Sequence, residues 1–204
     1  MKTIIAVAFI AILTYAFAQK PSQSNRCKHK AMQNFDSTKY LQIPRAYATH
    51  SKDEIPYLTV CGVLETTQKS DSTVDTLMYG YYQDSGKTHY SEAQCNTKVE
   101  SVKTGQFYED CIVINDTLFE DPKIYKDIVH KVYVSVIDTD YENYSILYRC
   151  LEDEVDGFQD TILVLKIDKD ANDDLVKEAL GKVGMDLQSF NPYTNNTYCD
   201  DIKI

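Results

Sequence analysis

The sequence predicts an all-β protein: an antiparallel up-and-down barrel of eight strands with one C-terminal α-helix. Eight short segments rich in β-branched and aromatic residues are separated by turn residues about every dozen positions. No helical pattern lies between these segments, which argues against a parallel sheet. The one helical pattern, residues 172–184, follows the last strand.

The N-terminal segment, residues 1–18, is expected to be a secretory signal peptide. Lys2 supplies a positive start, residues 4–17 are almost wholly apolar, and Ala16-Phe17-Ala18 is a small-x-small cleavage site. The apolar run is too short for a membrane anchor. We therefore expect residues 19–204 to be secreted, extracellular and free of membrane insertion. This length suits a single domain.

The strands are expected at residues 46–52, 57–67, 73–82, 87–95, 105–114, 129–137, 144–151 and 160–167. The segment 129–137 is the clearest, because it reads as β-branched and aromatic throughout. Turn residues such as Asp71-Ser72 and Asp156-Gly157 separate neighbouring segments. Eight strands can close into a barrel, which removes sheet edges and leaves room for one small ligand.

The helix is predicted to begin after Asn172, a good N-cap, with Asp173 and Asp174 in its first turn. Gly184 can end it in the left-handed conformation. Five apolar residues recur at helical spacing: Leu175, Val176, Ala179, Leu180 and Val183. We expect this stripe to pack on the barrel wall rather than to dock a partner.

The charge and the motifs narrow the function. A formal net charge of −10 should repel nucleic acid and anionic membranes, and it could attract a cationic small molecule or a basic protein surface. The same charge is also typical of a protein that is simply kept soluble. The chain has no nucleophile elbow, phosphate loop or metal-spaced cluster, so we expect no enzyme and no metal site.

Six cysteines follow the signal segment, an even number that predicts three disulfides in an oxidising compartment. Spacing alone leaves about 15 connectivities open. Three N-x-[ST] sequons make Asn115, Asn143 and Asn195 candidates for N-glycosylation, and each points to an exposed loop.

Several short motifs follow one another along the chain: Lys30-Ala31-Met32, Asn34-Phe35-Asp36, Lys39-Tyr40, Ile43-Pro44, Tyr47, Thr49-His50-Ser51, residues 102–107 leading to Cys111, Asp140-Tyr141, Asn143-Tyr144 and Cys150. Eight strands followed by one helix is the lipocalin layout. Together, the motifs and the layout resemble a known family, the triabin-type salivary lipocalins of blood-feeding bugs, and within it the pallidipin group. The usual Gly-x-Trp of lipocalins is absent, and residues 43–46 stand in its place.

The resemblance implies a disulfide pairing and a haem-free barrel. By family pattern, Cys27 would pair with Cys150, Cys61 with Cys199, and Cys95 with Cys111. Relatives that carry nitric oxide place a haem-ligating histidine on the third strand, where this chain has Gly80. Glycine has no side chain to ligate iron, so we expect no haem and no other cofactor.

The expected ligand pocket lies inside the barrel. Met78, Gly80 and Tyr82 share one face of the third strand, and the resemblance places Gly80 at an inward position. Further lining candidates, from the first, fifth and eighth strands, are Tyr47, Phe107 and Thr161. An apolar and aromatic cavity with a few hydroxyls would suit an amphipathic lipid such as an eicosanoid. Its carboxylate would require an inward base, for which Arg45 and Arg149 are candidates.

Two classes of function follow from the resemblance. The first is a secreted monomer that inhibits collagen-induced platelet aggregation by sequestering a small host mediator, with thromboxane-like eicosanoids as leading candidates. The second is a protein-binding inhibitor of a coagulation protease or of the contact (kallikrein–kinin) system, which a barrel filled by large side chains would favour. A biogenic-amine carrier is a further alternative, and it would need inward carboxylates.

Overall fold

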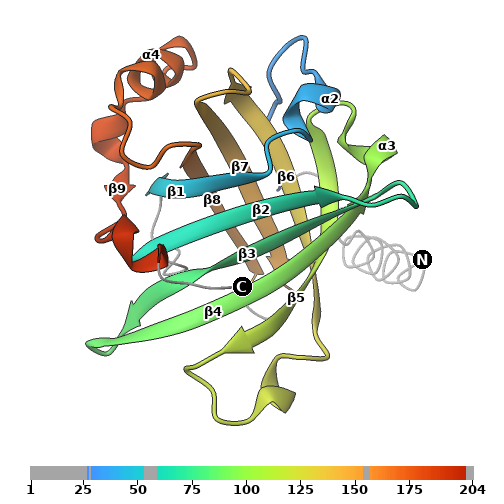
Figure 1. Cartoon of the computed structure of the whole chain (residues 1–204), viewed down its shortest axis with the longest axis vertical. Helices are drawn as coiled ribbons and strands as arrows, with labels where there is room; N and C mark the ends of the chain where they lie inside the picture. The colour runs from blue at the N-terminus through green and yellow to red at the C-terminus, as the bar shows by residue number, and fades with distance from the viewer. Residues whose placement is uncertain (1–26, 28, 53–58, 154–156, 201–204) are drawn as a thin grey trace, which may run out of the picture.

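The computed structural model describes residues 27, 29–52, 59–153 and 157–200, and these form the predicted antiparallel barrel (Figure 1). Eight strands follow one another around the barrel in sequence order. They are β1 (Arg45–Lys52), β2 (Cys61–Gln68), β3 (Thr73–Asp84), β4 (Lys87–Lys98), β5 (Gln106–Asp116), β6 (Val129–Thr139), β7 (Tyr144–Asp153) and β8 (Gly157–Lys166). The segments 1–18 and 201–204 lie outside the described residues, as do 53–58 and 154–156.

Strand β1 closes the barrel because it pairs with two neighbours. Its residues 45–48 pair with β2, and its residues 47–52 pair with β8. A register shift between Ala48 and His50 accompanies this change of partner, and such irregularities bend a strand. A short ninth strand, β9 (Asn191–Pro192), pairs with the same part of β1 from outside the barrel.

Most predicted strands are present with different ends. Strand β2 begins at Cys61 rather than at residue 57, and residues 57–58 are not described. Strand β3 continues to Asp84 and β4 to Lys98, because the hairpin ladder between them is unbroken over twelve residue pairs. Strand β8 begins at Gly157 and ends one residue before the predicted Ile167.

Several short helices were not predicted, because they are too short to show a helical period. They are α2 (Ser37–Tyr40), α3 (Val99–Val102) and the 3₁₀ turns Pro122–Ile124, Leu187–Ser189 and Asn196–Cys199. The side chain of Asp36 caps α2 by accepting hydrogen bonds from the backbone N–H groups of Thr38 and Lys39. Helices α2 and α3 lie at the same end of the barrel (Figure 1).

The predicted C-terminal helix is α4 (Asp174–Lys182), with Asp173 at the N-cap position and Val183 at the C-cap. Val176, Ala179 and Leu180 are buried, as predicted. The prediction is wrong for the two ends of the apolar stripe, because Leu175 and Val183 are 48% and 40% exposed. Leu175 lies in the first turn of the helix and Val183 is its C-cap, so the buried part of the stripe is confined to the middle of α4.

Three apolar clusters hold the fold together. One fills the barrel, with Ala48, Phe107, Val134, Leu147 and Leu163 among its members. A second lies between the outer wall of β6–β8 and α4. A third lies on the outer wall of β2 and β3, beneath the C-terminal tail.

The three disulfides are Cys27–Cys150, Cys61–Cys199 and Cys95–Cys111, the pairs that the family resemblance implied. The first fastens the N-terminal segment to β7, and the second fastens the tail to β2. The third joins β4 and β5 within the interior cluster. Within the ranges that the structure covers, none of the helices has the length and apolar character that a membrane crossing requires.

Candidate ligand-binding site

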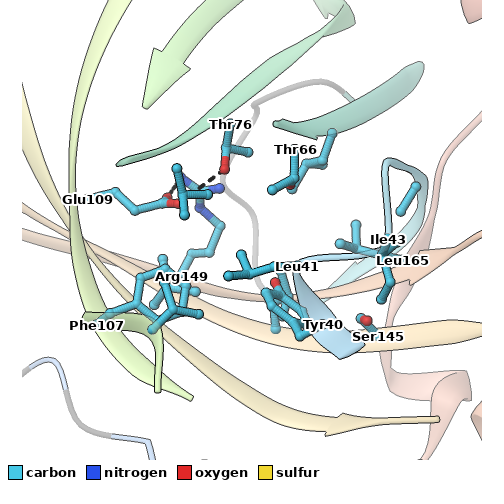
Figure 2. Close-up of a pocket in the computed structure, with 16 residues that line it drawn as sticks. Tyr40, Leu41, Ile43, Thr66, Thr76, Phe107, Glu109, Ser145, Arg149 and Leu165 are labelled. Atoms are coloured by element: carbon cyan, nitrogen blue, oxygen red, sulfur yellow. Dashed lines mark hydrogen bonds and ion pairs between the residues drawn. The ribbon is translucent and has the colours of Figure 1, made fainter. Parts of the chain in front are cut away.

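A small cavity lies inside the barrel, near the end that carries α2 and α3 (Figure 2). Its free volume is about 40 Å³, which is room for a few water molecules. Tyr40, Leu41 and Ile43 enter the interior from the segment between α2 and β1 and fill most of this end. A pocket for a drug-sized ligand needs about 300 Å³ or more, so this end is packed in the present conformation.

Two oppositely charged side chains meet in the wall of the cavity. Arg149 of β7 and Glu109 of β5 are both buried, and Nη2 of the arginine lies 3.4 Å from Oε2 of the glutamate. Strand alternation points both inward: Glu109 lies between Phe107 and Cys111 on β5, and Arg149 is opposite Val134 on β6. The barrel therefore encloses an ion pair in otherwise apolar surroundings.

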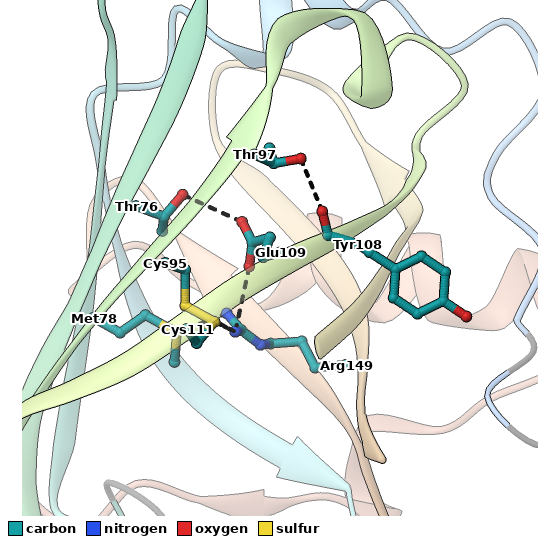
Figure 3. Close-up of a disulfide and its surroundings, with 8 residues drawn as sticks. All are labelled: Thr76, Met78, Cys95, Thr97, Tyr108, Glu109, Cys111 and Arg149. Atoms are coloured by element: carbon teal, nitrogen blue, oxygen red, sulfur yellow. Dashed lines mark hydrogen bonds and ion pairs between the residues drawn. A yellow bond between two sulfur atoms is a disulfide. The ribbon is translucent and has the colours of Figure 1, made fainter. Parts of the chain in front are cut away.

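The guanidinium of Arg149 has mostly weak acceptors around it (Figure 3). Its Nη1 lies 2.6 Å from the Met78 thioether sulfur, and its Nη2 lies 3.8 and 3.9 Å from the sulfurs of Cys95 and Cys111. Sulfur is a poor hydrogen-bond acceptor. The contact to Glu109 is also long, since charge-assisted N–H···O bonds are about 2.7–2.9 Å. Arg149 thus retains capacity to donate to a stronger acceptor.

The electrostatics of Glu109 are set by its burial. Burial raises the pKa of its carboxyl group, whereas the positive charge of Arg149 and a hydrogen bond from Thr76 lower it, and the net pKa lies above the ordinary value. The Thr76 hydroxyl donates to Oε1 at 3.4 Å (Figure 3). A proton therefore binds to Glu109 more readily than to a surface glutamate.

Two buried phenol groups also lie in the interior. Burial raises the pKa of Tyr40, an effect that the charge of Glu109 increases and that of Arg149 reduces. Burial likewise raises the pKa of Tyr193, which belongs to the interior cluster. Both phenols remain protonated in the neutral pH range and can donate a hydrogen bond.

A row that includes small residues lies toward the opposite end of the barrel. Cross-strand pairing aligns Gly62, Gly80, Ser91 and Asp116 in one row over β2 to β5. Glycine is required at position 80, because a Cβ atom there would lie 2.1 Å from the Cys61 carbonyl oxygen. The two glycines and Ser91 add little side-chain volume to this part of the wall, where Tyr82 of β3 is a bulky inward neighbour.

The row ends in a buried carboxylate. Asp116 accepts a hydrogen bond from the Tyr82 hydroxyl at 2.8 Å and another from the Leu118 backbone N–H at 2.9 Å. The Tyr125 hydroxyl accepts a hydrogen bond from the backbone N–H of Asp116. The interior thus has an inward carboxylate near each end, Glu109 and Asp116.

The sequence comparison identifies the family. The family model described as Triabin matches residues 16–179, which is well over half of the chain. The chain belongs to the triabin family.

The triabin-family relatives cover the chain nearly end to end. Pallidipin of Meccus pallidipennis is 35% identical over 204 residues and is covered in full, as is this chain. Platelet inhibitor triplatin-2 of Triatoma infestans is 33% identical over 190 residues, which is 93% of this chain and 96% of that protein. Dipetalodipin of Dipetalogaster maximus is 33% identical over 93% of this chain and 95% of its own length.

Solved structures share the lipocalin-like fold of this triabin-family chain. The tryptamine complex of the amine-binding protein of Rhodnius prolixus has a TM-score of 0.63 at 20% identity, covering 86% of this chain and 88% of that one. A complex of LTBP1 with leukotriene C4 has a TM-score of 0.51 at 21% identity, with coverages of 80% and 89%. At these identities the likeness concerns the fold.

Five of the six predicted pocket residues face the interior of this triabin-type barrel. Phe107 lines the cavity. Met78 contacts the guanidinium of Arg149, and Gly80 and Tyr82 follow it on the same face of β3. Thr161 is opposite Arg149 in the register of β7 and β8, and its hydroxyl donates to the Lys52 carbonyl oxygen. That these residues contact a ligand stays a prediction.

The prediction is wrong for Tyr47, which lies on the outer face of the barrel. It pairs with Val63, and both belong to the cluster beneath the C-terminal tail. The inward residues of this part of β1 are its neighbours Ala46 and Ala48. Arg45 shares the outward face with Tyr47, where it stacks on the Tyr47 ring and pairs with Glu65. Of the two arginines considered, only Arg149 points inward.

Sequence reasoning missed Glu109, although a signal was present. Phe107 is predicted to face inward, and a period of two carries the same face to Glu109 and Cys111. No such pattern marks Tyr40, Leu41 or Tyr193. These residues reach the interior from segments outside the barrel strands.

The sequence predicts neither a metal site nor a haem site. Cys95, Glu109 and Cys111 lie close enough together to resemble a metal-ligand group, but the two cysteines form a disulfide and offer no thiolate. At position 80, any side chain would collide with the Cys61 backbone. A haem-ligating histidine therefore does not fit at position 80. A haem-free barrel remains our prediction.

The three sequon asparagines are exposed, but the prediction of a loop is wrong for Asn115, which lies in β5 and pairs with Glu92 of β4. Asn143 lies between β6 and β7, where its side-chain amide donates to Asp140 at 2.7 Å. Asn115 lies at the end of β5, and Asn195 lies in the C-terminal tail. Glycosylation of these residues stays a prediction.

Proposed function

We propose that this protein is secreted with saliva and impairs host haemostasis by inhibiting collagen-induced platelet aggregation, without enzymatic chemistry. It would act as a monomer that sequesters a small amphipathic mediator, such as a thromboxane-like eicosanoid, inside the barrel. The platelet inhibitor among its relatives supports the physiological role. The observation that carries the mechanism is the inward guanidinium of Arg149, whose acceptors are mostly weak.

Arg149 is suited to a fatty-acid carboxylate because a guanidinium can donate two parallel hydrogen bonds to it. The hydrocarbon tail would extend toward the opposite end of the barrel, along the row of small residues that includes Gly62 and Gly80. The cavity of about 40 Å³ near α2 is too small for the tail, so the ligand would use the opposite end or displace Leu41.

Calorimetric titration with a stable, carboxylate-bearing thromboxane mimetic tests this proposal. We expect Arg149→Met to weaken binding by about 10- to 100-fold, as the loss of a charge-assisted hydrogen bond requires. Arg45→Met is the matched control, because Arg45 lies on the outer face and is 38% exposed in its side chain. Absence of binding by the unmodified protein, with inhibition of collagen-induced aggregation retained, would rule out sequestration of this mediator.

A protein-binding inhibitor is the second candidate. It is favoured by the packing of large side chains into the cavity end near α2 and by an exposed apolar surface. Four apolar side chains of the segment joining β5 and β6, and that of the first residue of β6, are 38–63% exposed: Leu118, Phe119, Ile124, Ile128 and Val129. Such a surface is typical of an interaction site. Clotting and kallikrein assays with a Phe119→Ser, Ile124→Ser variant would test it. A variant that no longer inhibits clotting or kallikrein, but binds the thromboxane mimetic as the unmodified protein does, would favour this candidate.

A biogenic-amine carrier is the third candidate, favoured by the inward carboxylate of Asp116. An ammonium group could pair with it, since the Tyr82 hydroxyl and a backbone N–H are the contacts found there. Titration with tryptamine, serotonin and histamine, each against Asp116→Asn, would test it. If Asp116→Asn binds an amine with the same affinity as the unmodified protein, Asp116 is not part of the amine site.

A further inference from the structure

Arg149, the base of the proposed ligand site, is already paired with a carboxylate of the protein itself. Oε2 of Glu109 lies 3.4 Å from Nη2, where a ligand carboxylate would also bind. Both side chains are almost fully enclosed, with 10% and 6% exposure. The two charges cancel, so the interior around them is electrically neutral before any ligand arrives.

An anionic ligand at Arg149 would upset this balance. Two carboxylates would then share one guanidinium in a medium of low dielectric constant, where like charges repel strongly. The groups that face Glu109 are Arg149 from β7, the Thr76 hydroxyl from β3 and the Tyr40 phenol from the α2 segment. Strand β6 presents the apolar Val132 opposite it.

None of these facing groups other than Arg149 carries a positive charge. The disulfide between Cys95 and Cys111 adjoins the pair and is neutral. Tyr193, whose pKa responds to the charge of Arg149, is a neutral phenol. A second cation is therefore not available among the described neighbours, and a proton from solvent is the remaining means of compensation.

We propose that an anionic ligand displaces Glu109 from Arg149 and that Glu109 then takes up one proton, so that the barrel binds a carboxylate together with a proton. This inference rests on the proposed binding of a carboxylate lipid. The proton comes from the buffer and binds a carboxylate oxygen of Glu109, and no covalent bond to the ligand forms. Protonated Glu109 can donate a hydrogen bond to the ligand carboxylate or remain bonded to Thr76.

Burial supports this coupling, because the pKa of Glu109 is already raised while Arg149 is beside it. Moving Arg149 toward a ligand removes the influence that lowers this pKa most, so the pKa rises further on binding. Between the pKa values of the free and the bound protein, affinity for a carboxylate should increase about tenfold for each unit by which the pH falls. Neutral ligands should show no such dependence.

Titration of the full-length mature protein in two buffers tests the proposal. The thromboxane mimetic is titrated at pH 7.4 in phosphate and in Tris, whose ionisation enthalpies differ, and the observed heats give the number of protons taken up. We expect close to one proton for the unmodified protein with the free acid, and none with the methyl ester of the same mimetic. Affinity for the acid should fall as the pH is raised from 6 to 8.

Glu109→Gln removes the titrating group while keeping its shape and its contact with Thr76. We expect this variant to bind the acid at least tenfold more tightly at pH 7.4, without proton uptake and without pH dependence. Glu65→Gln, on the outer face beside Arg45, is the control and should behave as the unmodified protein.

The outcomes separate the two proposals. Binding of the acid without proton uptake by the unmodified protein would overturn the coupling and leave the proposed function intact. Persistence of the pH dependence in Glu109→Gln would likewise overturn the coupling alone. Absence of binding by both proteins would overturn the proposed function and the coupling together.

Discussion

The inner and outer faces of strand β7 are both buried, yet they are built from different chemistry. Outward, Ile146, Tyr148 and Cys150 pack beneath α4 and the N-terminal segment. Inward, Ser145, Leu147 and Arg149 line the cavity. The outer face contributes apolar burial and a disulfide, which stabilise the fold, whereas the inner face holds a charge.

The difference indicates that the two faces of β7 contribute differently to stability. A buried ion pair is a poor way to stabilise a barrel, because desolvation of two charges can exceed their attraction. Apolar residues of similar volume at the positions of Glu109 and Arg149 would pack as well or better. This argument fits the ligand binding that we propose for Arg149, and the following variants test the contrast between the two faces.

The largest expected effect comes from breaking the inner pair. Glu109→Leu would leave the Arg149 guanidinium buried without a counter-charge and should lower the free energy of unfolding by about 3–5 kcal/mol. Urea denaturation measures it. The control is Glu65→Gln, which breaks the part-exposed pair with Arg45 but keeps an acceptor for the Tyr79 hydroxyl, and it should cost less than about 1 kcal/mol. Equal losses of unfolding free energy in the two variants would contradict the contrast between the inner and the outer face.

A cavity made on the outer face should lower the free energy of unfolding without changing ligand binding. Leu180 of α4 is fully buried against the outer wall, and Leu180→Ala should cost about 2–5 kcal/mol. Leu175→Ala on the same helix is the control, because Leu175 is 48% exposed and should cost about 0.5 kcal/mol or less. Thermal unfolding and ligand titration of both variants would show whether the two faces act independently.

Replacing both members of the inner pair should change the free energy of unfolding in the opposite direction to Glu109→Leu, or leave it unchanged. The double variant Glu109→Leu, Arg149→Leu removes the desolvation of both charges, and we expect it to be as stable as the unmodified protein or more stable by about 1–4 kcal/mol. It should no longer bind the carboxylate mimetic. A double variant as unstable as Glu109→Leu would show that the pair itself holds the barrel together.

The smallest effect concerns pH and compares two carboxylates. Burial disfavours the charge of Asp140, but hydrogen bonds from Asn143, Glu142 and Tyr144 lower its pKa overall. A lowered pKa adds stability that is present above the unfolded-state pKa and is lost as the pH falls through the folded-state pKa. Asp140→Ala should therefore cost about 0.5–2 kcal/mol at pH 7 and progressively less below about pH 4, as measured by urea denaturation.

Glu109 should behave in the reverse manner, because its pKa is raised. The folded state then binds more protons than the unfolded state, and stability falls as the pH rises from the unfolded-state pKa to the folded-state pKa. The same titration series on Glu109→Gln, in which this slope should disappear, is the check. A variant that keeps the slope would assign it to another carboxyl group.

The fold was predictable because its signals are local. Alternating segments such as residues 129–137 and turn residues between them specify hairpins, and hairpins in sequence order close into a barrel. The strand ends were less predictable, since a ladder such as β3–β4 continues until its turn irrespective of residue type. The prediction was wrong for the inward face of β1, and for Tyr47 with it, because alternation does not say which face is inside.

The site was less predictable than the fold because it is made of long-range contacts. Glu109 and Arg149 are forty positions apart, and only the closed barrel brings them together. Filling of the cavity end by Tyr40 and Leu41 depends on how a short N-terminal helix enters the barrel. Neither contact leaves a periodic pattern in the sequence.

The pattern of disulfides has a consequence for a protein that meets proteases. Cys27–Cys150 spans the first part of the chain, and Cys61–Cys199 overlaps it and reaches the tail. A single peptide bond cut anywhere between Cys27 and Cys199 therefore leaves two fragments that are still joined covalently. A nick in the exposed segment between β5 and β6 would not release either piece, and the barrel strands would remain tethered at the high effective concentration that favours their re-pairing.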